Sequence, residues 1–275
     1  MKLRTLVFSM FLVLFNLSAC EYQVISKTPS YSPDIEETVS PSINNCGLLE
    51  ISTDFKEGQV PKNLKEAQQE YEQWKSIAIT VENNTIIATK NKQISYGEIE
   101  VENGIIIGTN HGEFGGDIKF KSSFGFEYKI LDENFFGFYT FEEKNFVITG
   151  LAHMFTDYGY VYELIFSNNK WQAKKIFDID SQPESFLAVN NDLFIVTKNT
   201  LLVLKGGLES KVLIDNAFWE PYFPFFQNGF NFFGPLAPRS MVYGNNSIYI
   251  GMYGGMYAYD LNTGTDKWYD FLPER

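Results

Sequence analysis

The stretch SIYIGMYGGMYAYDLNTGTDKWYDF, residues 247–271, decides the fold class of this chain. Two runs in it alternate apolar and polar residues, and a Gly-Gly pair lies between them. An Asp-Leu-Asn-Thr-Gly turn then leads to Trp268. Alternation with a period of two residues is typical of β-strands, and tight turns favour Gly, Asn and Asp. We therefore expect four antiparallel strands here, near residues 239–243, 247–252, 256–261 and 267–271.

The same pattern of an Asn-containing turn followed by an apolar strand recurs along the chain. It is found in VENNTIIAT (81–89), VENGIIIGT (101–109), EEKNFVITG (142–150), VNNDLFIVT (189–197) and YGNNSIYIG (243–251). From Asn103 onwards, the equivalent Asn residues are separated by intervals of 42, 46 and 55 residues. Four-stranded propeller blades repeat about every 40–45 residues. The sequence therefore predicts an all-β fold, a β-propeller of about five four-stranded blades over residues 76–275, with further units beginning near Ile99, Phe138 and Ser185.

One segment ahead of the strands has a helical period. KNLKEAQQEYEQWK, residues 62–75, places Leu64, Ala67, Tyr71 and Trp74 on one face, which predicts one short N-terminal amphipathic helix. Residues 46–75 are thus expected to form an N-terminal strand and helix. Within them, GLLEIST (47–53) is expected to pack against the propeller or to help close its ring.

The first twenty residues, MKLRTLVFSMFLVLFNLSAC, are arranged as a secretory signal. Lys2 and Arg4 precede an apolar run from about Leu6 to Phe15, which is too short to span a bilayer comfortably. The end of the segment, Leu17-Ser18-Ala19-Cys20, resembles the lipobox of bacterial lipoproteins. That resemblance implies that residues 1–19 are a signal peptide and that Cys20 carries fatty acyl chains.

Residues 20–45 follow as a lipidated cysteine and a tether. Pro29, Pro33 and Pro41 lie there among Ser, Thr and acidic residues, a composition typical of extended, poorly ordered linkers. The expected location is the bacterial cell envelope, with the chain held to a lipid bilayer through acylated Cys20. Glu21 rather than Asp after the cysteine favours the outer membrane, on its periplasmic or surface side, if the cell is Gram-negative.

The net charge of the chain indicates which partners it can bind. The chain has 22 Lys and Arg against 34 Asp and Glu, a formal charge of -12. Removal of Lys2 and Arg4 with the signal peptide would leave 20 - 34 = -14. A surface of that sign repels phosphate backbones, so we expect no nucleic-acid partner.

The C-terminal unit also resembles the blade repeat of quinoprotein-like (PQQ-like) β-propellers. The matching residues are Gly255, Tyr257, Ala258, Asp260, Thr263, Gly264 and Trp268. The resemblance implies a blade closed by a tryptophan packed between neighbouring blades. It does not imply the quinone, because enzymes of that family hold it on a disulfide between adjacent cysteines, and this sequence has only Cys20 and Cys46. We expect no cofactor.

Candidate site residues follow from the order of strands in an up-and-down blade. Turns between second and third strands emerge on the same face as the crossings between blades. Both histidines of the chain, His111 and His153, fall in such turns, accompanied by Glu113 and Asp157. His111 and His153 are weak candidates for metal ligands, because their spacing matches no known ligand motif.

An aromatic insertion is expected on that face as well. FWEPYFPFFQNGFNFF, residues 218–233, has nine aromatic residues in sixteen positions. It is either a hydrophobic plug over the centre of the propeller or an exposed surface that binds a protein. In the second case Trp219, Tyr222 and Phe223 would be anchors, with Arg239 as the nearby cation.

These observations favour an envelope lipoprotein that binds a protein partner through one propeller face, rather than an enzyme. Two alternatives remain open at this stage. One is a metal-dependent hydrolase with its site at His111 and His153. The other is an immunity-type lipoprotein that neutralises a toxin.

Overall fold

The computed structural model describes residues 48–59, 77–89, 95–206, 209–217, 219 and 238–272. Within these ranges the regular structure consists of strands and one short 3₁₀ turn, η1 (Gly112–Phe114). The helix predicted over 62–75, the signal peptide and the tether all lie outside the described residues. No helix among the described residues is long and apolar enough to cross a membrane.

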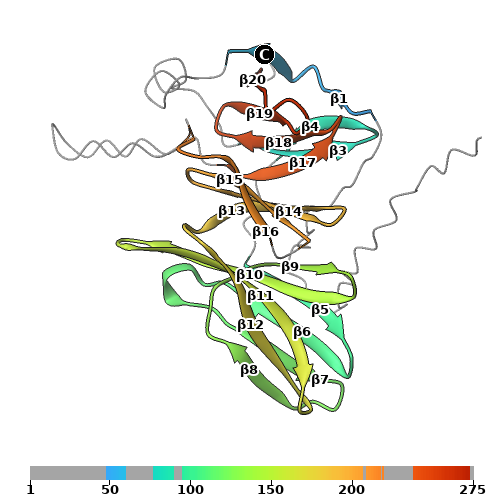
Figure 1. Cartoon of the computed structure of the whole chain (residues 1–275), viewed down its shortest axis with the longest axis vertical. Coiled ribbons are helices and arrows are strands. Elements are labelled where there is room, and N and C mark those ends of the chain that lie inside the picture. Colours follow the sequence, from blue (N-terminus) through green and yellow to red (C-terminus); the bar gives the residue numbers. More distant parts are fainter. Residues whose placement is uncertain are drawn as a thin grey trace, which may run out of the picture.

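The strands form five sheets, four of them with antiparallel neighbours throughout (Figure 1). Along the chain the first complete one contains β5 (Tyr96–Val101), β6 (Gly104–Thr109), β7 (Ile118–Ser122) and β8 (Glu127–Leu131). The next contains β9 (Phe135–Phe141), β10 (Lys144–His153), β11 (Thr156–Ser167) and β12 (Lys170–Ile179). A third contains β13 (Pro183–Val189), β14 (Asp192–Thr197), β15 (Leu201–Lys205) and β16 (Glu209–Ile214).

The remaining two sheets include the N-terminal strands. β17 (Ser240–Gly244), β18 (Ser247–Met252), β19 (Gly255–Asp260) and β20 (Asp266–Phe271) are extended at the outer edge by β2 (Phe55–Gly58). A three-stranded sheet pairs β3 (Ala78–Glu82) with β4 (Thr85–Thr89), and β1 (Glu50–Ile51) with β4 in parallel. The described part of GLLEIST therefore packs on the strand domain, as expected.

Asparagine in the left-handed backbone region makes most of the tight hairpin turns. Asn residues with positive φ lie in the turns β3–β4, β5–β6, β11–β12, β13–β14 and β17–β18: Asn83, Asn84, Asn103, Asn168, Asn169, Asn190, Asn245 and Asn246. Asn adopts this conformation at lower cost than most residues, so these turns fix the register of the flanking strands. The four strands of the 239–271 unit begin within one residue of their predicted positions, and the units expected at Ile99, Phe138 and Ser185 begin two or three residues earlier.

Four apolar cores join the five sheets in sequence. Ile106, Phe120 and Val147 belong to the core between the β5–β8 and β9–β12 sheets. Another core lies between the β9–β12 and β13–β16 sheets, a third between β13–β16 and β17–β20, and a fourth between β17–β20 and the β1/β3/β4 sheet. The sheets are stacked one on the next along the long axis of the molecule (Figure 1).

A closed ring is not shown. Among the described residues no buried core joins the β1/β3/β4 sheet to the β5–β8 sheet, and these two lie at opposite ends of the stack in Figure 1. The described chain is therefore an all-β stack of five sheets, and closure into a propeller stays a prediction.

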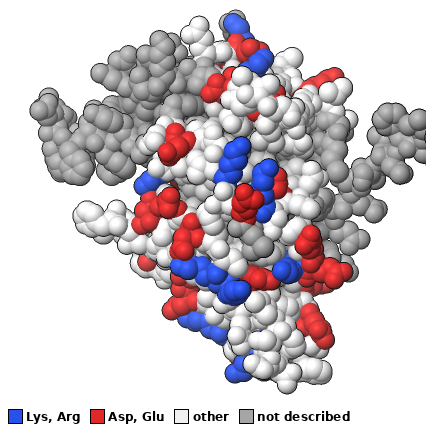
Figure 2. All heavy atoms as spheres, in the orientation of Figure 1, with Lys and Arg blue, Asp and Glu red and all other residues white. Residues whose placement is uncertain are grey.

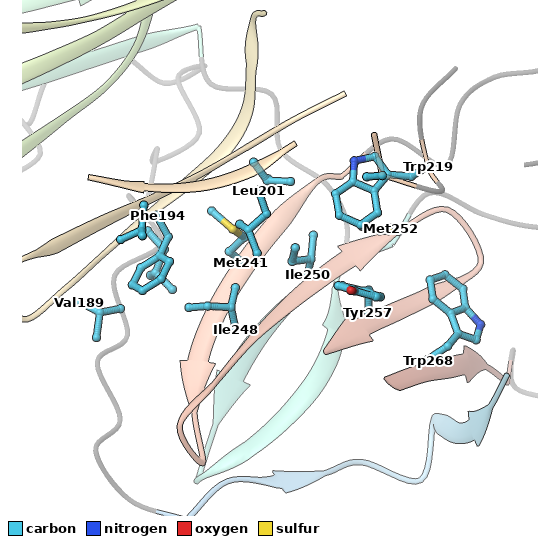
Figure 3. Close-up of a cluster of buried hydrophobic side chains, with 14 residues drawn as sticks. Val189, Phe194, Leu201, Trp219, Met241, Ile248, Ile250, Met252, Tyr257 and Trp268 are labelled. Atoms are coloured by element: carbon cyan, nitrogen blue, oxygen red, sulfur yellow. The ribbon is translucent and has the colours of Figure 1, made fainter. Parts of the chain in front are cut away.

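The stretch at 247–271 forms three strands of one sheet and part of the largest core. Trp268 and Tyr257 are buried there together with residues of the β13–β16 sheet (Figure 3). The carboxylate of Asp260 accepts hydrogen bonds from the backbone N–H groups of Asn262 and Thr263, each at 2.8 Å. These bonds lower the pKa of Asp260. The hydrogen-bonded turn at Asp260 and the buried Trp268 thus both belong to the 247–271 stretch.

Candidate functional site

The turns that carry the candidate site residues lie along one edge of the stack. It consists of the turns between second and third strands and the crossings between sheets, and we call it the crossover edge. Its main segments are the η1 turn, the β10–β11 turn at 154–155, the crossing at 180–182 and the β14–β15 turn at 198–200. The Asn turns named above lie at the opposite edge, which we call the Asn-turn edge. In Figure 1 the β10–β11 hairpin projects from the left side of the stack.

The structure brings Glu113 and His153 together across two sheets. The His153 Nε2 atom lies 3.1 Å from Oε2 of Glu113, with both side chains partly exposed. The η1 turn that carries Glu113 is fixed by Asn134, whose Nδ2 donates to the carbonyl of Gly112 at 2.8 Å. His111 is exposed and is not part of this contact. Across the described ranges no group of three His, Cys, Asp or Glu side chains is arranged to hold a metal ion.

Asp157 lies on the same edge but in a separate cluster. Its carboxylate accepts hydrogen bonds from Ser181 Oγ at 2.9 Å and from the backbone N–H of Gln182 at 2.7 Å, and it forms an ion pair with Lys198. Gln182 Oε1 in turn accepts from the N–H of Ala152 at 2.6 Å. Asp157 therefore fastens the base of the β10–β11 hairpin to the crossing into the next sheet.

We expect Asp157→Ala to lower the free energy of unfolding by about 1–3 kcal/mol, because it removes the acceptor of several partly buried donors. Urea denaturation followed by circular dichroism measures the loss. Asp132→Ala is the matched control, since Asp132 pairs with Lys129 at 2.8 Å with both side chains well exposed. Exposed pairs contribute about 0–1 kcal/mol. Equal losses in the two variants would show that Asp157 is not a structural clamp.

Glu184 is a partly buried carboxyl beside this cluster that the sequence analysis missed. Burial raises its pKa from 4.5 to about 7, and the charge of Asp157 adds to the rise, whereas Arg239 and Lys198 oppose it. Arg239 is partly buried just before β17, and its Nε has no hydrogen-bond partner in the part of the chain that the structure describes. Arg239 therefore belongs to a charged cluster at the junction of three sheets, together with Asp157, Glu184 and Lys198.

Exposed apolar side chains form the tip of the crossover edge. Phe114, Met154 and Phe155 are 85%, 86% and 104% exposed. They flank Glu113 and His153 in sequence, whose contact joins the two turns. In Figure 2 the projecting hairpin at the left carries no Lys, Arg, Asp or Glu colour. We call Phe114, Met154 and Phe155 the apolar tip.

The β10–β11 turn differs in sequence from the Asn-containing hairpins of the chain. His153 pairs with Thr156, so Met154 and Phe155 form a two-residue loop, and Met154 has a φ of 52°. Asn-Gly is the pair that such loops favour, and an unbranched apolar residue with positive φ is uncommon there. Since this chain places Asn in five other turns, the Met-Phe pair is not explained by the needs of the hairpin.

The position of Trp219 contradicts its interpretation as part of an exposed protein-binding surface. Its side chain is fully buried, its Nε1 donates to the Thr197 carbonyl at 3.1 Å, and its ring lies edge-on to Tyr257 at 5.4 Å (Figure 3). Trp219 is therefore a core residue, and its assignment as an exposed partner anchor is wrong. Tyr222, Phe223 and the rest of 220–233 lie outside the described residues.

Comparisons with known proteins assign no family. No protein-family model and no curated protein matches the sequence. Among solved structures, the chain is similar to the extracellular domain of a one-component system from B. thetaiotaomicron, with a TM-score of 0.31 and 12% identity over 74% of this chain. The match spans 30% of that domain, less than a third of its length. A likeness at this level assigns neither fold family nor function.

Proposed function

We propose that this protein is an envelope lipoprotein, anchored in a bilayer through acylated Cys20, that binds a protein partner through the crossover edge. The supporting observation is the apolar tip, where three fully or mostly exposed large side chains lie around the Glu113–His153 contact. Apolar side chains exposed together, with polar groups at their rim, are characteristic of protein-binding surfaces. The tip lies at one edge of the five-sheet stack, where the Glu113–His153 contact joins its two turns. The proposal includes no catalytic step.

The partner that suits this tip has an apolar groove with a basic rim. Phe155 and Met154 project from a hairpin, so they fit a concave surface better than a flat one. The lipoprotein without its signal peptide carries a formal charge of 20 - 34 = -14, which favours a positively charged partner through long-range attraction. Arginine or lysine beside the groove would meet Glu113 at the rim.

The test is to remove the apolar tip while improving the turn. Met154→Asn with Phe155→Gly should keep or raise the melting temperature, because Asn-Gly is the favoured two-residue hairpin loop. The same variant should lose a partner captured from envelope extract by the lipidated protein, as measured by quantitative mass spectrometry. Val212→Ser, which removes a 54% exposed apolar side chain on β16, away from the apolar tip, is the matched control and should retain capture.

The anchoring part of the proposal has its own readout. Cys20→Ala should abolish incorporation of labelled fatty acid and release the protein from the membrane fraction. Capture that survives the loss of Met154 and Phe155 would contradict the binding site, and fatty-acid labelling that survives Cys20→Ala would contradict the anchor.

A further inference from the structure

A second group of exposed aromatic residues lies at the Asn-turn edge. Phe124 and Phe126, in and next to the β7–β8 turn, are 89% and 57% exposed, and Phe166, at the end of β11, is 39% exposed. Both hairpins are the connections between third and fourth strands, in adjacent sheets. In Figure 1 both reach the lower end of the molecule. This surface is therefore distinct from the apolar tip, which lies at the other edge.

Contacts behind Phe126 and Phe166 join the two hairpin ends into one surface, and Phe124 lies in the same turn as Phe126. Phe126 stacks on Tyr128 with ring centroids 6.5 Å apart, and Phe166 packs on Trp171 at 5.3 Å. The backbone N–H of Trp171 donates to the hydroxyl of Tyr128 at 2.6 Å, which joins β8 to β12. The Nζ of Lys170 lies 5.9 Å from the Tyr128 ring. We call Phe124, Phe126 and Phe166 the aromatic surface.

The described chain begins at this same edge. The backbone N–H of Leu49 donates to Asn245 Oδ1 in the β17–β18 turn at 2.8 Å, and that of Glu50 donates to the carbonyl of Asn84 in the β3–β4 turn at 2.8 Å. Leu48, just before them, is 85% exposed. The segment that leads back to Cys20 therefore joins the domain at the Asn-turn edge, on the side that carries the aromatic surface.

We propose that the aromatic surface rests on the lipid bilayer in which the protein is anchored, with Phe124 inserted among the acyl chains. The inference rests on the proposed anchoring at Cys20. Residues 21–47 separate Cys20 from Leu48, and fully extended they would span about 90 Å. Five stacked sheets, about 10 Å apart, place the two ends of the stack about 40 Å from each other. The tether is thus long enough for the far end of the stack to reach the same bilayer.

A bilayer is the occupant that the attachment of the tether at this edge favours. The aromatic surface is formed by two hairpin ends. Fluid acyl chains accommodate projecting apolar groups without a preformed pocket. Burial of aromatic side chains supplies the affinity, since the lipidated protein, with a formal charge of 20 - 34 = -14 after loss of Lys2 and Arg4, gains no net attraction to anionic lipids. The stem of Lys170 can lie along the rings while its ammonium group meets lipid phosphates. Tethering makes this second contact intramolecular, so a weak interaction suffices.

The contact would orient the domain. With the Asn-turn edge on the bilayer, the crossover edge and its apolar tip face away from the membrane. A partner would then reach Met154 and Phe155 from the aqueous side. One edge thus serves the membrane and the other the partner.

The test uses the full lipidated protein in phosphatidylcholine vesicles. In a Cys46→Ser background, Phe124→Cys carries an environment-sensitive fluorophore, and Phe155→Cys carries it in the matched control. We expect the label at 124 to be quenched by spin-labelled lipid and to be quenched by aqueous iodide several-fold less than the label at 155. The label at 155 should be open to iodide.

Flotation of the vesicles distinguishes failure of the lipid anchor at Cys20 from failure of the bilayer contact at Phe124. A protein that does not float overturns the lipid anchor, and this inference with it. A protein that floats with its label at 124 as open to iodide as that at 155 overturns the inference alone. Shielding of 124 that requires an added envelope protein also overturns it and assigns the aromatic surface to protein binding.

Discussion

Replacing Trp219 with alanine is expected to lower the free energy of unfolding by about 3–5 kcal/mol, the usual cost of removing a large aromatic side chain from a core. Trp219 has no exposed surface and belongs to the core between the β13–β16 and β17–β20 sheets. The truncation would leave a cavity next to Tyr257 and the Thr197 carbonyl without its indole donor. Urea denaturation followed by tryptophan fluorescence and circular dichroism measures the change.

Trp219→Phe is the control that separates packing from hydrogen bonding. It keeps a ring against Tyr257 but removes the Nε1 donor, so its loss should be clearly smaller than that of the alanine variant. A loss below about 1 kcal/mol for Trp219→Ala would contradict the core assignment, since surface substitutions cost about that much or less. It would also restore Trp219 as a candidate partner anchor.

The strands and turns could be predicted from the sequence because their causes are local. Alternation of apolar and polar residues fixes which face of a strand is buried, and the Asn turns fix where each strand ends. For this reason the predicted strand positions in the 239–271 unit agree with the structure to within one residue. Other two-residue turns lack Asn. Met154 and Phe155 form the β10–β11 turn, and between β9 and β10 the residues with positive φ are Glu142 and Glu143, while Asn145 lies within β10.

Ring closure could not be judged from strand periodicity, because it depends on the outer faces of the two end sheets. Register places Glu98, Glu100, Lys119 and Lys121 on the face of the β5–β8 sheet that points away from its core. At the other end, Thr80, Thr85 and Thr89 lie on the outer face of β3 and β4. Ile105 and Ile107 share the first of these faces. Ile87 and the buried Ala78 share the second. Both faces therefore mix polar and apolar residues, and neither decides whether the ring closes. The number of repeats in the sequence does not show whether the two end sheets meet.

The sequence predicts the edge of the fold on which the candidate site lies, but it does not predict the contacts that its side chains make. The assignment of His111, Glu113, His153 and Asp157 to one edge follows from strand order alone. The partners of Asp157, however, come from residues 24 to 41 positions further along the chain, so no local motif marks them. Glu184 carried one signal that could have been used, a charge at the second position of β13, shortly before the apolar run Phe186–Val189.

Glu184 should make the stability of the fold depend on pH. Its pKa is raised by burial to about 7 in the folded chain, against 4.5 ordinarily. The folded state therefore holds a proton that the unfolded state loses, so the stabilising contribution is complete below about pH 4.5 and is lost as pH rises through about 7. A shift of this size corresponds to about 3 kcal/mol.

Glu184→Gln removes the titrating group while keeping its shape, so its stability should no longer fall over that interval. We expect the variant and the wild type to unfold with similar free energies near pH 4.5, and the variant to be more stable by up to about 3 kcal/mol at pH 8. Urea denaturation of both proteins across this range measures the difference, in which the titration of all other groups cancels. Parallel curves for the two proteins would contradict a neutral Glu184. They would show instead that Arg239 and Lys198 keep its carboxylate ionised within the folded chain, as the opposing effect of their charges allows.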